Sequence, residues 1–117
     1  MSNKKYDIYE RIFKFIVMVI KIIRYLPRTE ENLVVIKQIL RSVTSMGANS
    51  QEADGASSKK DFLHCFTTVR KEAKETEFWL KLIVELNLKA QVSGRKLIEE
   101  CRQIIAIVSK IISNTRN

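Results

Sequence analysis

Apolar side chains recur at steps of three and four residues along four long stretches of this chain. Such spacing places them on one face of an α-helix. The chain has 117 residues, the length of one ordinary domain, and its one proline and three glycines leave few sites that interrupt regular structure. We therefore predict a single all-α domain over residues 1–117, with helices at about residues 6–26, 30–54, 58–86 and 93–114.

The predicted helix ends carry cap signals. Pro27 stops the first helix, because the residue before a proline is driven out of the helical conformation. Thr29 is a cap for the second helix, and Ser58 with Asp61 three residues later forms a capping-box pattern for the third. Helices of these lengths joined by short connections prefer antiparallel neighbours. The predicted fold is an antiparallel up-down-up-down four-helix bundle.

The second helix has an apolar face that we assign to Leu33, Ile36, Leu40 and Val43, continued by Met46 and Ala53. Gly47 lies in the middle of this helix, where glycine costs about 1 kcal/mol relative to alanine. A glycine at such a position indicates that another helix packs closely against it. We therefore expect close helix packing at Gly47 and no ligand loop.

A polar stripe runs along the same helix, where a soluble bundle normally buries leucine and isoleucine. It faces polar residues of the third helix if the two helices form a hairpin that turns near residue 56. In that register, residues whose numbers sum to about 113 lie at the same height. We interpret the two sets as a structural polar network that fixes the register of the helices. The predicted pairs are Arg41 with Glu72, Gln38 with Glu75, Ser45 with Thr68, and Asn49 with His64, while Thr76 extends the stripe of the third helix.

An arginine–glutamate pair between helices is charge-assisted, and removing one member of a buried pair strands the other. We therefore expect Arg41→Ala to lower the melting temperature far more than Lys37→Ala. The functional alternative is a pocket lined by Arg41, Glu72, His64 and Asn49, in which His64 is a general base.

Several observations weigh against that pocket. His64 has only Cys65 as a neighbouring nucleophile, and adjacent residues point about 100° apart on a helix. No histidine–glutamate metal spacing recurs on a second helix, as a dinuclear bundle site requires. We favour the structural interpretation and expect no enzyme, no catalytic residue, no metal and no cofactor.

The formal net charge is +8, and the isoelectric point is near 9.7. The excess lies mainly in residues 1–28, with seven basic and two acidic residues, and in residues 91–117, with five and two. Such a charge favours an acidic partner such as nucleic acid, and Tyr6 and Tyr9 are the aromatic candidates for base stacking. The alternative, a solvated surface that serves solubility, stays open. The candidate nucleic-acid contacts are Lys4, Lys5, Arg11, Lys14, Lys21, Arg24, Lys59, Lys60, Arg95 and Lys96.

The apolar run at residues 15–20 is flanked by Lys14 and Lys21 and is far shorter than the roughly 20 residues that span a bilayer. No signal-peptide pattern is present. Neither Cys65 nor Cys101 has a CxxC partner, so we expect both cysteines to be small buried hydrophobes. We expect a cytoplasmic protein without a membrane partner. A membrane-surface role for the basic first helix is a weaker alternative, because the bundle needs its apolar face.

The end of the third helix is apolar on several faces. A helix of this kind is buried on more than one side. In so small a bundle, the surplus suggests contact with another subunit, although a fully intramolecular core is the alternative. The candidate subunit interface consists of Phe78, Trp79 and Leu82.

The central part of the chain resembles a known family. The segment from Gln38 to Gly55 reads QILRSVTSMGANSQEADG, and SSKKDF at residues 57–62 and RKEAKETEFWL at residues 70–80 continue the pattern. The match covers the Arg-Ser-x-x-Ser-x-x-x-Asn core that begins at Arg41 and the Lys-Glu-Ala-x-Glu-Thr run that begins at Lys71. These features are similar to the 23S ribosomal RNA intervening-sequence proteins, bacterial four-helix bundles, over essentially the whole chain. Many members have Glu-Gly at the end of the second helix, where this chain has Glu-Ala-Asp-Gly.

This resemblance implies a homopentameric ring or barrel, and it does not imply an enzyme. It also implies kinship with the accessory variability protein of diversity-generating retroelements, a basic pentamer that engages nucleic acid and a reverse transcriptase. The expected function is that of a non-enzymatic oligomeric bundle whose basic surface binds structured RNA or other nucleic acid. The alternative is a protein–protein interaction scaffold without nucleic-acid binding. The expected partners are further copies of the chain, RNA or DNA, and a protein such as a reverse transcriptase.

Overall fold

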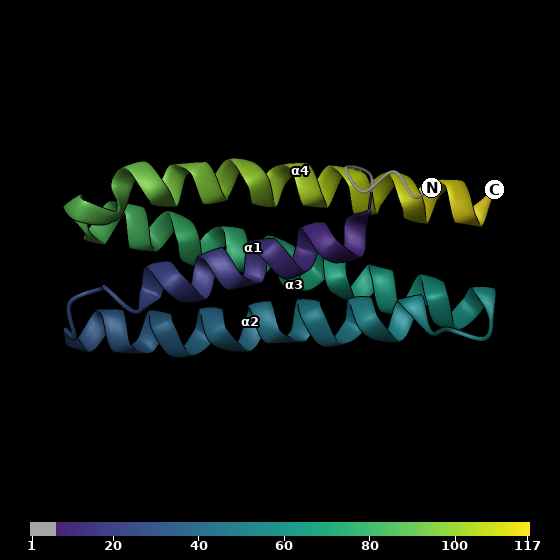
Figure 1. The fold of residues 1–117 in the computed structure, drawn as a ribbon, viewed down its shortest axis with the longest axis horizontal. Helices are drawn as coiled ribbons and strands as arrows, with labels where there is room; N and C mark the ends of the chain where they lie inside the picture. Colours follow the sequence, from purple (N-terminus) through teal and green to yellow (C-terminus); the bar gives the residue numbers. More distant parts are fainter. Residues whose placement is uncertain (1–6) are drawn as a thin grey trace.

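The computed structural model describes residues 7–117. Consecutive helices run in opposite directions along a bundle with extents of 45 × 26 × 20 Å (Figure 1). The prediction of an all-α four-helix bundle is confirmed. The elements are α1 (Ile8–Ile23), α2 (Glu30–Asp54), α3 (Lys59–Leu86), the short 3₁₀ helix η2 (Leu88–Ala90) and α4 (Gln91–Arg116).

Side-chain caps set three of the helix starts. Asp7 accepts hydrogen bonds from the amides of Tyr9 and Glu10, so α1 begins at Ile8, later than predicted. Thr29 and Ser58 cap α2 and α3 as predicted, each accepting from an amide three residues ahead. The first helix was predicted to reach residue 26, but α1 ends at Ile23 and a turn connects it to Pro27. The last helix, α4, follows η2 directly and begins two residues earlier than predicted.

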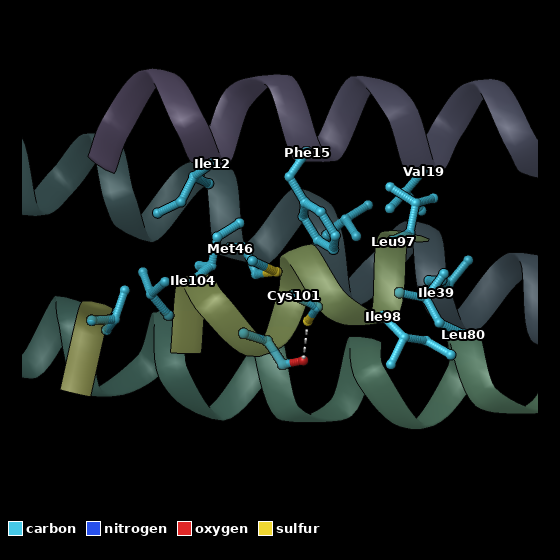
Figure 2. Packing of buried hydrophobic residues seen from close by; sticks show 14 of the residues in the cluster. Ile12, Phe15, Val19, Ile39, Met46, Leu80, Leu97, Ile98, Cys101 and Ile104 are labelled. Atoms are coloured by element: carbon cyan, nitrogen blue, oxygen red, sulfur yellow. Dashed lines mark hydrogen bonds between the residues drawn. The ribbon is translucent and has the colours of Figure 1, made fainter. Parts of the chain in front are cut away.

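The core lies along the bundle axis and receives side chains from all four helices. Phe15 and Ile12 of α1 point toward Met46 of α2, with Ile104 of α4 nearby (Figure 2). Cys101 is also fully buried, and its Sγ donates a hydrogen bond to the carbonyl oxygen of Ala73 at 3.2 Å (Figure 2). Burial raises the Cys101 pKa to about 12, which keeps this thiol protonated and unreactive.

The predicted apolar face of α2 is confirmed in the second half of the helix, where Val43, Met46 and Ala53 are buried. In the first half it is wrong by about one residue, because Leu33 is 50% exposed, whereas Val35 and Ile39 are buried. The buried face also contains three polar residues, and their polarity hides its periodicity from a hydropathy pattern. These residues are Asn32, Ser42 and Ser50.

Two glycines mark close contacts between helices. A Cβ added at Gly47 would lie 3.1 Å from Ile16 Cδ1, so α1 crosses α2 closely there, as predicted. A Cβ added at Gly94 of α4 would lie only 2.5 Å from Val84 Cγ2 of α3. The sequence analysis did not single out this second contact. No helix between residues 7 and 117 has the length and apolar character needed to cross a membrane.

Candidate functional site

The polar network between α2 and α3 centres on Arg41. This guanidinium donates a hydrogen bond to Glu75, and its Nη2 lies 3.4 Å from Glu72 Oε1. Trp79 Nε1 donates a second hydrogen bond to Glu75 Oε2 at 3.1 Å. These two hydrogen bonds, first from Trp79 and then from Arg41, hold the Glu75 pKa below its ordinary value.

Arg41 closes this network at the protein surface, since half of its side chain is exposed, whereas the Glu72 side chain is 11% exposed. Glu72 Oε1 is in ion-pair range of Arg41 but has no hydrogen-bond partner among the described residues. An ion pair of which one member is half exposed contributes less than a buried pair. The predicted stability difference between Arg41→Ala and Lys37→Ala therefore stays a prediction, with a smaller expected size.

Three predicted pairs are wrong. Glu75 bonds Arg41 and Trp79 instead of Gln38. Asn49 Nδ2 donates to the carbonyl and hydroxyl oxygens of Ser45 within α2, and Thr68 Oγ1 donates to the carbonyl oxygen of His64 within α3. The Asn49 and Thr68 side chains therefore bond backbone carbonyls of their own helices, and His64 is exposed.

The register differs because the connection between α2 and α3 extends outward along the bundle axis, so α3 begins beyond the end of α2 (Figure 1). The buried contact between the helices joins Ser42 Oγ and Thr76 Oγ1 at 2.7 Å. One of these hydroxyls donates to the other, and the accepting hydroxyl donates to a carbonyl of its own helix, which is that of Ile39 for Ser42 or that of Glu72 for Thr76. The buried polar residues of α2 thus lie one position away from the predicted stripe.

A second buried polar contact joins the two connections at the opposite end. Asn32 Nδ2 donates to Asn87 Oδ1 at 2.8 Å, and Asn87 Nδ2 donates to Asn32 Oδ1 at 3.0 Å. The remaining amide protons reach the carbonyl oxygens of Pro27 and Ile83. This reciprocal pair fixes the α1–α2 connection against the α3–α4 connection, and the sequence analysis missed it because the two residues are 55 positions apart.

The two ends of the bundle differ in charge. We call residues 21–31 and 81–96 the loop end; it carries seven basic and three acidic side chains, a net charge of +4. We call residues 52–61 and 110–117, together with Asp7, the hairpin end; it carries four basic and four acidic side chains. These two sets lie at opposite ends of the long axis (Figure 1). The positive excess among the described residues is therefore concentrated at the loop end.

The candidate nucleic-acid contacts consequently do not form one surface. Lys21, Arg24, Arg95 and Lys96 belong to the loop end, whereas Lys59 and Lys60 lie at the hairpin end (Figure 1). Arg95 and Lys96 are on different faces of α4, because neighbouring residues are about 100° apart on a helix. Lys4 and Lys5 lie outside the described residues.

Arg11 and Lys14 belong to the middle of α1. Arg11 donates to Glu100 Oε2 at 2.7 Å and also contacts Gln103, and the hydrogen bond to Glu100 raises the Arg11 pKa. This guanidinium is engaged within the protein by Glu100 and Gln103. Lys14 is exposed, and its Nζ lies 3.8 Å from Glu10 Oε1.

The aromatic candidates for base stacking also change. Tyr9 is partly buried, its ring centroid lies 5.9 Å from that of Phe66, and burial raises its pKa. Tyr6 lies outside the described residues. Tyr25, which the sequence analysis did not consider, is 87% exposed at the loop end.

Tyr25 lines an open groove of about 590 Å³ between the two connections of the loop end. The lining is mostly apolar, and Leu88, on the opposite connection, is 81% exposed. A patch of exposed apolar side chains ringed by polar ones marks an interaction site. The lining residues are Ile22, Tyr25, Leu26, Pro27, Leu86, Asn87, Leu88, Lys89, Ala90 and Ser93.

The candidate subunit interface lies on the outer side of α3. Phe78 is 53% exposed, Trp79 and Leu82 are partly buried, and the Phe78 and Trp79 ring centroids lie 4.9 Å apart. Trp79, Leu82 and the half-exposed Leu86 follow helical spacing and share one face. The interface itself stays a prediction.

Metal and thiol chemistry find no support in the described part of the chain. No group of three or more His, Cys, Asp or Glu side chains in residues 7–117 is placed to hold a metal ion. Burial raises the pKa of the partly buried Cys65 thiol, so it resembles an inert structural cysteine. No enzymatic feature is evident among these residues.

A family model for the 23S rRNA-intervening sequence protein matches residues 4–110. The chain belongs to this family. A crystal structure of a protein of unknown function from the S23 ribosomal protein family of Bacteroides thetaiotaomicron has 31% sequence identity and a TM-score of 0.81. The similarity covers 91% of this chain and 95% of that chain. The sequence resemblance to 23S rRNA-intervening sequence proteins is therefore confirmed. No curated protein matches the chain.

Proposed function

We propose that this 23S rRNA-intervening sequence protein is a non-enzymatic bundle that binds structured RNA or other nucleic acid through its loop end. The observation that carries the proposal is the charge difference between the two ends, +4 against zero. A cluster of lysine and arginine side chains binds phosphates and releases counterions, without reading base sequence. Binding should therefore weaken steeply as salt increases.

The test is the affinity of a fluorescently labelled structured RNA, measured by anisotropy at about 50 and 200 mM salt. Lys21→Gln/Arg24→Gln/Lys96→Gln removes three positive charges from the loop end. The matched control, Lys59→Gln/Lys60→Gln/Lys110→Gln, removes three from the hairpin end. We expect the first variant to bind at least tenfold more weakly at low salt and the control to bind within about threefold of the wild type.

Two results would contradict the proposal. If the wild type does not bind RNA at low salt, nucleic-acid binding is removed altogether. If both variants lose the same affinity, the loop end has no special role and only total charge matters. We expect both triple variants to remain helical, because all six substituted side chains are exposed. Circular dichroism checks this.

We also propose that copies of the chain assemble through the outer face of α3, and the family resemblance suggests five. The half-exposed Phe78, whose ring packs against Trp79, supports an apolar contact there. Light scattering should give about 68 kDa, five times the 13.6 kDa of one chain. Phe78→Glu should reduce that mass, whereas Phe13→Glu, which changes an even more exposed phenylalanine on α1, should not.

The second candidate function is a protein-interaction scaffold, favoured by the apolar lining of the loop-end groove. The resemblance suggests a reverse transcriptase as one such protein partner. Retention of a partner in a pulldown after nuclease treatment would support the scaffold over nucleic-acid binding.

A further inference from the structure

We propose that the loop-end groove holds an unpaired base of the bound nucleic acid, stacked on Tyr25. This inference rests on the proposed function and adds the part of the nucleic acid that is recognised. Phosphate contacts alone do not distinguish paired from unpaired strands, whereas an aromatic side chain in a groove does so, because a base inside a duplex is already stacked.

Tyr25 has the exposure and the fixed backbone that base stacking needs. Its ring is 87% exposed, yet its amide donates to the carbonyl oxygen of Ile22 at 3.1 Å. The next residue, Leu26, is buried in the core, and Pro27 follows with its fixed backbone torsion. The backbone at Tyr25 is therefore fixed by its neighbours, so the position from which the ring meets a base is set before binding.

The other wall of the groove comes from the α3–α4 connection. Leu88, which is 81% exposed, offers apolar surface to the second face of a base, and Leu86 continues the apolar lining. Asn87 lies between them and is fixed by its reciprocal hydrogen bonds with Asn32. The exposed Ser93 places a hydroxyl group in the lining, which can bond the edge of a base.

The charges around the groove fit an anionic strand. Lys89 is part of the lining, Lys21 and Arg24 immediately precede Ile22 and Tyr25, and Lys96 follows Ser93 by three residues on the same face of α4. Arg28 is held against the same connection, because its Nη1 donates to the carbonyl oxygen of Ile23 at 3.3 Å. None of the lining residues is acidic. Phosphates on both sides of a stacked base would meet these side chains.

An acidic amphipathic peptide would complement the positive charge around the groove as an anionic nucleic-acid strand does. Such a peptide places apolar anchors along a valley between elements over about two helical turns. This groove is instead lined by two short segments, residues 22–27 and 86–93, and has an exposed aromatic ring at its mouth. These features favour a single flat ring as the occupant.

The experiment compares two labelled RNAs of equal charge, a hairpin with an unpaired loop and a blunt duplex, by anisotropy at low salt. The variants are Tyr25→Ala and Tyr25→Phe, with Phe13→Ala as the control for an exposed aromatic side chain on another part of α1. We expect Tyr25→Ala to weaken binding of the hairpin about five- to hundredfold and to leave the duplex unchanged. Tyr25→Phe and Phe13→Ala should bind both RNAs like the wild type.

A 2-aminopurine in the hairpin loop gives a direct second reading, since its fluorescence should be quenched by the wild type and not by Tyr25→Ala. Equal affinity of the wild type for hairpin and duplex, with no effect of Tyr25→Ala, would overturn this inference and leave the proposed function standing. Failure of the wild type to bind either RNA would remove the proposed function as well. Displacement of a groove-bound acidic peptide without any loss of RNA affinity would assign the groove to a protein partner.

Discussion

The two ends of this bundle are built in different ways. At the hairpin end, the connection of residues 55–58 is held by local hydrogen bonds, such as Gly55 N to the Gln51 carbonyl oxygen and Asp61 N to Ser58 Oγ. At the loop end, two separate connections are joined by Asn32 and Asn87 across 55 residues of sequence. The hairpin end is electrically balanced, whereas the loop end carries a net charge of +4 and an apolar groove.

This difference indicates where a small bundle has surface available for binding. Excess positive charge costs stability through self-repulsion, and at the loop end it lies beside a backbone that the buried Asn32–Asn87 hydrogen bonds hold. The hairpin end needs no such support, because its charges are matched and its turn is closed by its own residues. Variants that test this contrast follow from the largest expected effect to the smallest.

The largest effect is expected from the asparagine pair. Asn32→Ala removes both hydrogen bonds to Asn87 and the one to the Pro27 carbonyl oxygen, leaving buried polar groups without partners. We expect a loss of about 1–3 kcal/mol in the free energy of unfolding, measured by urea denaturation. Asn49→Ala is the matched control in the same helix, because Asn49 is partly exposed and bonds only Ser45.

Coupling between the two asparagines sharpens this prediction. The Asn32→Ala/Asn87→Ala double variant should lose less free energy than the sum of the single variants, since each single change strands the other amide. Equal stability of Asn32→Ala and Asn49→Ala would show that the pair does not hold the loop end.

A smaller effect is expected from glycine-to-alanine substitutions, because the room for an added methyl group differs among the three glycines. Gly94→Ala places a methyl group 2.5 Å from Val84 Cγ2, and the resulting overpacking of about 1–3 kcal/mol exceeds the gain of about 1 kcal/mol in helix propensity. Gly47→Ala meets only the flexible end of Ile16 at 3.1 Å, and Gly55→Ala meets nothing closer than 3.9 Å. The melting temperature should therefore rise in the order Gly94→Ala, Gly47→Ala, Gly55→Ala. The reverse order would mean that α3 and α4 separate easily at Gly94.

The smallest effect is expected from Glu75→Gln in the middle of the bundle. This variant tests whether the loss of stability in acid arises there or at one of the two ends. Hydrogen bonds from Trp79 and Arg41 lower the Glu75 pKa below its ordinary 4.5, so this carboxylate stabilises the fold fully above that pH and loses its effect as pH falls through the lowered pKa. The difference in melting temperature between wild type and Glu75→Gln should thus be largest at neutral pH and vanish in acid. Glu85→Gln, exposed near the loop end, is the control. A constant difference across this pH range would contradict the prediction.

Helix number, order and most boundaries could be predicted from the sequence because their causes are local. Thr29 and Ser58 are both polar caps just ahead of apolar repeats, and Pro27 stands just beyond a turn. The register of α2 against α3 could not be predicted in the same way. The register depends on the direction of the four-residue connection between α2 and α3. Because α3 is displaced by a few residues from the predicted register, only Arg41 and Glu72 of the predicted pairs are in contact.

The candidate site was predicted only as a set of basic residues. Charge counts along the sequence point to the first and last segments, yet folding brings the end of α1 beside the start of α4 and sends Lys59 and Lys60 to the opposite end. Tyr25 and Lys89 lack any sequence signal, since an exposed tyrosine and a loop lysine are ordinary residues. Only the approach of the two connections makes them part of one groove.

The asparagine pair also has a consequence for how the chain folds. Contacts between residues far apart in sequence are slow to form, because a long loop must close before they stabilise the structure. The hairpin end can close through neighbouring residues, whereas Asn32 and Asn87 meet only after both α2 and α3 have reached nearly full length. We therefore expect the groove to form late in folding, after the positive charges of the loop end are already present on the chain.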